Sequence, residues 1–139
     1  PHECAIIREL VVPEEPYSID TDIALLRLDL PMRSEPVRLA ERLPWRAEIV
    51  TVIGRDRSYL RYAELENDEW FLTAPLAGET ERGVCYGDSG GPAFDDWGNL
   101  LALTHAVATG GNCRSWSQHV SVVPWLDWIE DTIYSSSGR

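Results

Sequence analysis

The feature that most constrains this chain is the run Cys85-Tyr86-Gly87-Asp88-Ser89-Gly90-Gly91-Pro92, which lies among segments rich in strand-forming residues. Glycine adopts backbone angles that other residues resist, and it lets another backbone or a ligand approach closely. A serine on such a bend can point its hydroxyl outward while neighbouring amide N–H groups converge on one point. Acyl transfer needs that combination of a nucleophile and donors for a developing oxyanion. The alternative is an ordinary glycine-rich turn.

The whole run, Cys-x-Gly-Asp-Ser-Gly-Gly-Pro, resembles the nucleophile loop of trypsin-like (chymotrypsin-fold) serine proteases. The resemblance implies that Ser89 is the nucleophile and that the backbone N–H groups of Gly87 and Ser89 form the oxyanion hole. It also implies an all-β fold, part of a chymotrypsin-like double β-barrel with a C-terminal helix. Residues 1–36 would be a remnant holding the late strands of the first barrel. Residues 37–139 would be the linker, the second barrel and the helix.

A second segment, Asp22-Ile23-Ala24-Leu25-Leu26, resembles the part of the same family that carries the catalytic aspartate. An acid at the head of a buried strand can accept the N–H of an imidazole, fix its tautomer and stabilise the imidazolium. The alternative is that Asp22 only caps a strand end. Because the serine loop follows in the order that the family shows, we interpret Asp22 as catalytic.

The triad also needs a histidine, which in the family precedes the aspartate by roughly 45 residues. His2 precedes Asp22 by only 20 positions (22 − 2), and the sequence around it is Pro-His-Glu-Cys rather than Ala-Ala-His-Cys. We therefore reject His2 as the base. We expect the histidine to come from a companion N-terminal segment or chain, and we expect the isolated chain to lack meaningful hydrolysis. Asp88 resembles the residue that pairs with the activated N-terminus, for which no partner can be identified in the sequence.

Local patterns predict the remaining elements. Runs rich in β-branched and apolar residues predict strands, at residues 5–12, 23–28, 48–54, 62–65, 70–74, 92–94, 100–105 and 118–123. The segment 95–99 predicts a hairpin turn, and the proline-containing segment 30–45 predicts a connector. Residues 124–134 predict a helix that begins with proline and places Trp125, Trp128, Ile129 and Ile133 on one face. Residues 135–139 predict a frayed tail.

The resemblance also implies a primary substrate pocket, which would be lined by Gly83, Val84, Tyr86, His105, Ala106, Val107, Ser117 and His119. Gly83 stands where enzymes that cut after arginine or lysine have an aspartate, so we expect a preference for apolar or acidic residues instead. Two interpretations of the histidines stay open. His105 or His119 points into the pocket and favours acidic side chains, or both are ordinary packing residues. Glu79 and Glu81 could instead attract a basic residue.

Three cysteines are present, so at least one is unpaired within the chain. The resemblance implies a disulfide between Cys85 and Cys113 that braces the pocket, and Cys4 has no partner that we can name. A disulfide weakly favours a secreted or periplasmic location.

The formal net charge of −11 argues against nucleic acid as a partner, because phosphate binding needs a basic surface. No apolar run is long enough to span a membrane, no cofactor motif occurs, and the cysteines and histidines lack metal-ligand spacing. Two functions remain: a serine endopeptidase acting on protein or peptide substrates, and a catalytically inactive binding or regulatory module with the same fold.

Overall fold

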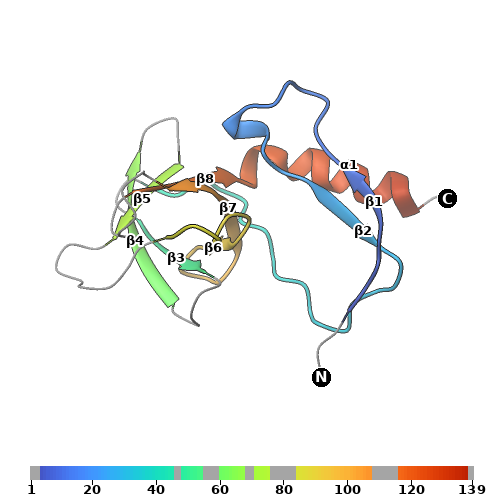
Figure 1. Ribbon diagram of the computed structural model, residues 1–139, viewed down its shortest axis with the longest axis horizontal. Coiled ribbons are helices and arrows are strands. Elements are labelled where there is room, and N and C mark those ends of the chain that lie inside the picture. Colours follow the sequence, from blue (N-terminus) through green and yellow to red (C-terminus); the bar gives the residue numbers. More distant parts are fainter. Residues whose placement is uncertain are drawn as a thin grey trace.

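The computed structural model describes residues 4–45, 48–54, 60–67, 71–75, 84–107 and 116–137; for residues 49, 60–67, 71–75, 107, 136 and 137 it describes the backbone only. These ranges form two sheets and a C-terminal helix (Figure 1). The strands are β1 (Ile7–Val11), β2 (Leu25–Leu28), β3 (Ile49–Ile53), β4 (Leu60–Asn67), β5 (Phe71–Pro75), β6 (Pro92–Phe94), β7 (Leu100–Val107) and β8 (Ser117–Ser121). Among the described residues, no helix has both the length and the apolar composition needed to cross a membrane.

Strands β3 to β8 close into a barrel in the order β3-β4-β5-β8-β7-β6, and β6 pairs with β3 to complete the ring. All its pairings are antiparallel. Strand β3 shows why its sequence forms a barrel wall. Every residue is β-branched, and Val50 and Val52 are buried while Thr51 is half-buried and Ile53 is exposed. This alternation puts one face of the strand into the barrel core.

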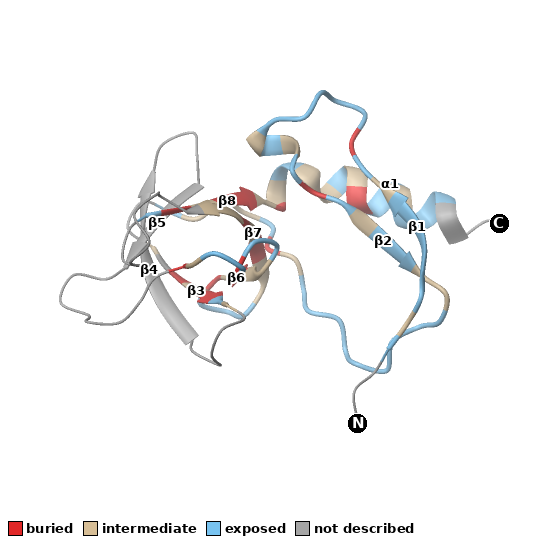
Figure 2. Ribbon diagram, viewed as in Figure 1, coloured by how far each residue is buried: buried red, intermediate tan, exposed pale blue. Residues whose placement is uncertain are grey.

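The barrel core consists of small and branched apolar side chains: Ala40, Val50, Val52, Val84, Ala93, Leu101 and Ala102. Figure 2 shows buried residues on the barrel strands, in α1 and in the segment between β1 and β2. The core therefore includes Val84, which lies at the start of the nucleophile loop, so that loop is anchored in the barrel wall.

The first sheet contains only β1 and β2, which pair antiparallel with Leu10 opposite Leu26 and Glu9 opposite Arg27. Arg27 Nη1 donates to Glu9 Oε2 over 3.1 Å. Leu10 and Leu26 are 61% and 51% exposed. In Figure 2, strands β1 and β2 have the colours of exposed and intermediate residues. The prediction of a buried strand at residues 23–28 is therefore wrong for β2, because no further strand covers this face within the described part of the chain.

The helix α1 (Leu126–Ser137) ties the first sheet to the barrel, and it follows the short 3-10 turn η2 (Val123–Trp125). Ile23 packs with Val120, Val122 and Ile129 in a second core cluster. The Trp125 Nε1–H also donates to the Asp20 carbonyl oxygen over 2.8 Å. The chain just before Asp22 is therefore held against the end of the barrel.

The helix differs from its prediction at both ends. It begins two residues later than residue 124, because Pro124 lies in η2, and it continues to Ser137 rather than fraying after residue 134. Ile129 is buried as expected, but Ile133 is 56% exposed. The apolar face of the helix is therefore covered only in its first half.

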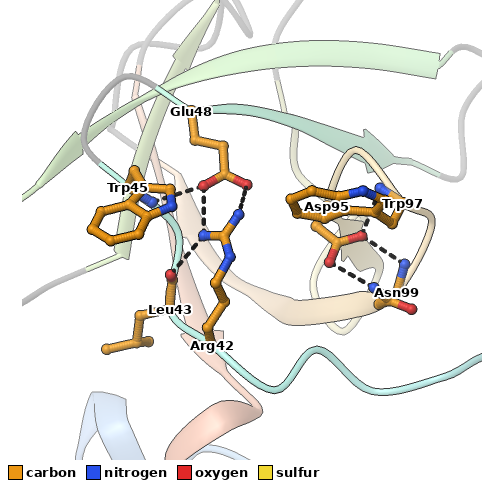
Figure 3. A network of polar contacts seen from close by, with 7 residues as sticks. All are labelled: Arg42, Leu43, Trp45, Glu48, Asp95, Trp97 and Asn99. Atoms are coloured by element: carbon orange, nitrogen blue, oxygen red, sulfur yellow. Dashed lines mark hydrogen bonds and ion pairs between the residues drawn. The ribbon is translucent and has the colours of Figure 1, made fainter.

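The connector joins the barrel through Arg42 (Figure 3). Its guanidinium donates to both carboxylate oxygens of Glu48 over 2.9 and 3.0 Å and lies over the rings of Trp45 and Trp97. Burial disfavours the charged Glu48 side chain, but the hydrogen bonds from Arg42 and the Trp45 N–H outweigh it and lower the pKa of Glu48.

The predicted hairpin turn is closed by Asp95 (Figure 3). Its Oδ1 accepts the N–H groups of Trp97 and Asn99, and its Oδ2 accepts the Asn99 side chain. Gly98 has a φ of +80°, which a turn of this kind requires of glycine. The turn at residues 95–99 is therefore confirmed.

Candidate active site

The nucleophile loop has the backbone bends that its glycines predict. Gly87 and Gly90 adopt φ values of +96° and +78°, in the left-handed region that glycine tolerates. Ser89 lies between these two bends and is exposed. The serine hydroxyl therefore stands at the surface of the barrel.

Two hydrogen bonds fasten this loop to β7. The Gly90 N–H donates to the Thr104 carbonyl oxygen over 2.7 Å, and the Thr104 N–H donates to the Gly91 carbonyl oxygen over 2.8 Å. A Cβ atom on Gly91 would lie 2.8 Å from the carbonyl oxygens of both Asp88 and Ile53, so only glycine fits there. This close packing holds the loop that carries Ser89 against the strand that carries His105.

The amide groups of the loop divide into two sets. The N–H groups of Asp88, Gly90 and Gly91 donate to carbonyl oxygens. Those of Gly87 and Ser89 donate to no acceptor among the described residues. These two are the amides that the sequence resemblance assigns to the oxyanion hole, and both are available to an outside oxygen atom.

Asp88 is turned inward beneath the loop. Its side chain is buried, and its Oδ2 accepts the Cys85 N–H over 2.8 Å. The carboxylate packs so closely on Gly54 that a Cβ there would lie 2.6 Å from Asp88 Oδ1. Asp88 therefore stabilises the buried side of the loop, whereas Ser89 lies on its exposed side.

Asp22 follows the 3-10 turn η1 (Ile19–Thr21), and its Oδ2 lies 2.5 Å from His105 Nδ1. The side chains of His105 and Asp22 are 15% and 44% exposed. Sequence reasoning treated His105 as a pocket residue and did not place it on Asp22. The two residues are 83 positions apart, so no local pattern carries this contact.

One cavity of about 550 Å³ brings the principal residues together, and Ser89, Asp22 and His105 all line it. Its wall also includes Glu15 and Tyr17 from the loop after β1. A nucleophilic hydroxyl, a carboxylate and an imidazole therefore face a single space large enough for a substrate side chain or a further protein side chain.

The other predicted pocket residues are spread over the barrel. Val84 is buried, Ala106 is half-buried, and Tyr86 is 75% exposed. Gly83, Cys113 and the Val107 side chain lie outside the described residues. Ser117 and His119 are both 2% exposed, on a strand that pairs with β7.

The ring of His119 is engaged at both nitrogen atoms. Nε2 lies 3.1 Å from Ser117 Oγ, and Nδ1 lies 3.3 Å from Thr104 Oγ1. Burial lowers the pKa of His119 to about 4. The imidazole is therefore neutral at physiological pH, and it lies inside the barrel wall rather than beside Asp22.

The structure describes two of the three cysteines. Cys85 is disulfide-bonded, whereas Cys4 is free and exposed. Because Cys113 lies outside the described residues, its pairing with Cys85 stays a prediction. Within the described ranges, no three histidine, cysteine or acidic side chains gather as a set of metal ligands.

The sequence matches no protein-family model and no curated protein, but solved structures share its fold. One is neuropsin, a serine protease expressed in the limbic system of mouse brain, with a TM-score of 0.69 and 17% identity over 93% of this chain and 71% of neuropsin. HBP has a TM-score of 0.75 and 18% identity, covering 94% of this chain and 67% of HBP. A mutant of human heparin binding protein has a TM-score of 0.74 and 18% identity, with coverage of 94% and 66%.

These likenesses establish the fold. The chain has the chymotrypsin-like fold of trypsin-like serine proteases, as the sequence predicted. It spans about two thirds of the length of these neighbours. The division at residue 36 stays a prediction, although β1 and β2 make no strand pairing with the described barrel strands.

Proposed function

We propose that this chain is the serine-bearing part of an endopeptidase that cleaves peptide bonds through an acyl-enzyme on Ser89. The observation that carries this proposal is the shared cavity. Ser89 and Asp22, from distant parts of the sequence, line the same space. The neighbouring N–H groups of Gly87 and Ser89 support it further, because they are available to stabilise an oxyanion.

In the proposed reaction, Ser89 Oγ attacks the scissile carbonyl while an imidazole accepts the hydroxyl proton. The N–H groups of Gly87 and Ser89 bind the tetrahedral oxyanion, and Asp22 stabilises the imidazolium. The imidazole then gives its proton to the leaving amine, and the C–N bond breaks. Water releases the acyl group from Ser89 by the same steps, which restores the hydroxyl.

We propose that the base is supplied by a companion N-terminal segment or chain. His119 is buried with both ring nitrogens engaged, and His105 has no hydrogen bond to Ser89. His2 lies outside the described residues. The apolar pair Leu10 and Leu26 supports a companion, because both side chains are more than half exposed at the centre of the β1–β2 sheet. Contiguous exposed apolar surface is typical of an interaction site.

The substrate residue before the scissile bond is proposed to be apolar or acidic rather than arginine or lysine. Gly83 in place of an aspartate, and the apolar Val84 beside it, support this preference. Cleavage of a mixed peptide library by the assembled protein tests it. Cleavage confined to sites after arginine or lysine contradicts it.

Labelling with a fluorophosphonate tests the catalytic assignment. The assembled protein should be labelled on Ser89, and Ser89→Ala should abolish the label without altering the unfolding midpoint, because Ser89 is exposed. The isolated chain should label far more slowly. Labelling that persists at full rate in Ser89→Ala would reject Ser89 as the nucleophile.

A second function, a catalytically inactive binding module, is favoured by one observation: two of the neighbours are forms of HBP, and the human protein is named for binding heparin. The formal net charge of this chain, −11, argues against heparin as its own ligand, because heparin is a polyanion. An assembly that retains its fold and a protein partner but never reacts with the fluorophosphonate would favour this second function.

A further inference from the structure

His105 occupies a break in the pairing of β7 with β8. Thr104 pairs with His119 and Ala106 pairs with Gln118, so His105 has no partner in the register. A β-bulge of this kind turns its extra residue away from the regular alternation of the strand, and bulges often re-aim a side chain beside an active site. Here the side chain is aimed at Asp22.

The contact with Asp22 indicates which nitrogen of the His105 ring carries the hydrogen. An ionised carboxylate only accepts hydrogen bonds, so the Nδ1 atom that lies 2.5 Å from Asp22 Oδ2 carries a hydrogen. Asp22 Oδ1 accepts no hydrogen bond from the described residues. One oxygen of the carboxylate is therefore occupied and the other is open on a side chain that is 44% exposed.

On the basis of the function proposed above, we propose that His105 is a positioning residue for the triad. Its Nδ1–H holds one oxygen of Asp22 and thereby leaves the other oxygen to accept the N–H of the catalytic imidazole. Because the carboxylate follows a turn and is partly exposed, it would otherwise rotate among several orientations. A fixed carboxylate holds the catalytic ring in the tautomer that can take the Ser89 proton.

Two variants separate positioning from mere packing. Asparagine places an amide N–H near the position of Nδ1, whereas alanine removes the donor. In the assembled protein, His105→Ala should lower kcat by about tenfold to a hundredfold with little change in KM, as expected for a lost hydrogen bond to a charged group. His105→Asn should restore the hydrogen bond and stay within about threefold of the parent. Equal activity in both variants overturns the proposal.

The isolated chain gives a readout that does not depend on activity. In ¹⁵N NMR of the histidine rings near pH 7.5, His105 should be the Nδ1–H tautomer, and Asp22→Ala should shift it towards the Nε2–H tautomer. The His119 signals serve as the internal control, because that ring binds Ser117 and Thr104 and not Asp22. An Nε2–H tautomer that Asp22→Ala leaves unchanged overturns the proposal.

The activity and NMR experiments also distinguish a failure of the positioning role of His105 from a failure of the proposed protease function. Rapid fluorophosphonate labelling of the isolated chain that is lost in His105→Ala would make His105 the base itself, and so overturns a positioning role. An assembly that never labels rejects the proposed function, and the tautomer of His105 then decides whether it holds Asp22.

Discussion

Two glycines of the nucleophile loop differ in the space around them. A Cβ atom on Gly91 would lie 2.8 Å from two backbone carbonyl oxygens, those of Asp88 and Ile53. At Gly87, by contrast, an added Cβ atom would meet no heavy atom within 4 Å, but the backbone adopts a φ of +96°. The two glycines are therefore required for different reasons. The first provides close approach of two segments, and the second provides an unusual backbone angle.

This difference predicts unequal costs for two alanine substitutions. Gly91→Ala should lower the free energy of unfolding by about 3 kcal/mol, because the added methyl group must displace backbone atoms. Gly87→Ala should cost about 1 kcal/mol, the usual strain of the left-handed region. Urea unfolding of both variants measures the two values. Equal losses would show that the contacts around Gly91 relax freely.

His119 predicts a dependence of stability on pH. Its pKa is about 4 in the folded chain against an ordinary value of 6.5, so between these values the unfolded state binds a proton that the folded state does not. The free energy of unfolding therefore has its full value above pH 6.5. It decreases as the pH falls, and the loss from His119 reaches about 3 kcal/mol at pH 4. His119→Gln, which cannot titrate, should show a flatter profile of unfolding free energy from pH 6.5 to 4. Parallel profiles for the two proteins would contradict this assignment.

At the scale of elements, the position of Asp22 depends on contacts between segments far apart in sequence. The turn η1 is held to the barrel by Ile23, which packs on β8 and α1, and by the indole of Trp125. The nucleophile loop is held to β7 by two hydrogen bonds with Thr104. Both halves of the candidate site thus rest on neighbouring barrel strands, the nucleophile loop on β7 and the Asp22 segment on β8 and the turn that follows it.

Trp125→Phe tests one of these ties. The substitution keeps most of the packing but removes the N–H that donates to the Asp20 carbonyl, so the free energy of unfolding should fall by about 1 kcal/mol. It should also loosen the contact between His105 and Asp22, which the ring NMR signals report. Trp116→Phe is the matched control, because that indole is 47% exposed. Equal losses in both variants would assign the effect to ring size.

At the scale of the whole molecule, the two sheets differ in how completely they are covered. The barrel strands close on themselves and bury an apolar core. The β1–β2 sheet exposes Ile7, Leu10 and Leu26, each to more than half of its surface. Two strands alone rarely form a stable unit, and this sheet is supported by Leu25 of β2, which packs in the cluster that contains Ile129 of α1.

We expect the open face to drive association. The isolated chain should self-associate at micromolar concentration, and replacing Leu10 and Leu26 together by threonine should reduce that association while preserving strand propensity. Analytical ultracentrifugation measures both proteins. The control replaces Val37 and Leu43, which are similarly exposed on the connector. An undiminished association of the Leu10/Leu26 variant would remove this face as the contact surface.

The local conformations of this chain follow from short stretches of its amino-acid sequence. The bends of the nucleophile loop follow from its glycines, the alternation of β3 follows from its β-branched run, and the turn at residues 95–99 follows from its Asp and Gly. These features depend on neighbouring residues, so a short window of sequence contains their cause.

Contacts between distant residues, in contrast, depend on the tertiary packing of the chain. The pairing of β5 with β8, the exposure of β2 and the contact of His105 with Asp22 depend on how the barrel closes and on what packs beside it. The local sequence does not distinguish a strand histidine that is buried in a core, such as His119, from one that contacts a carboxylate, such as His105. The difference arises from one bulge and from a turn 83 residues away, and neither leaves a local signal in the amino-acid pattern.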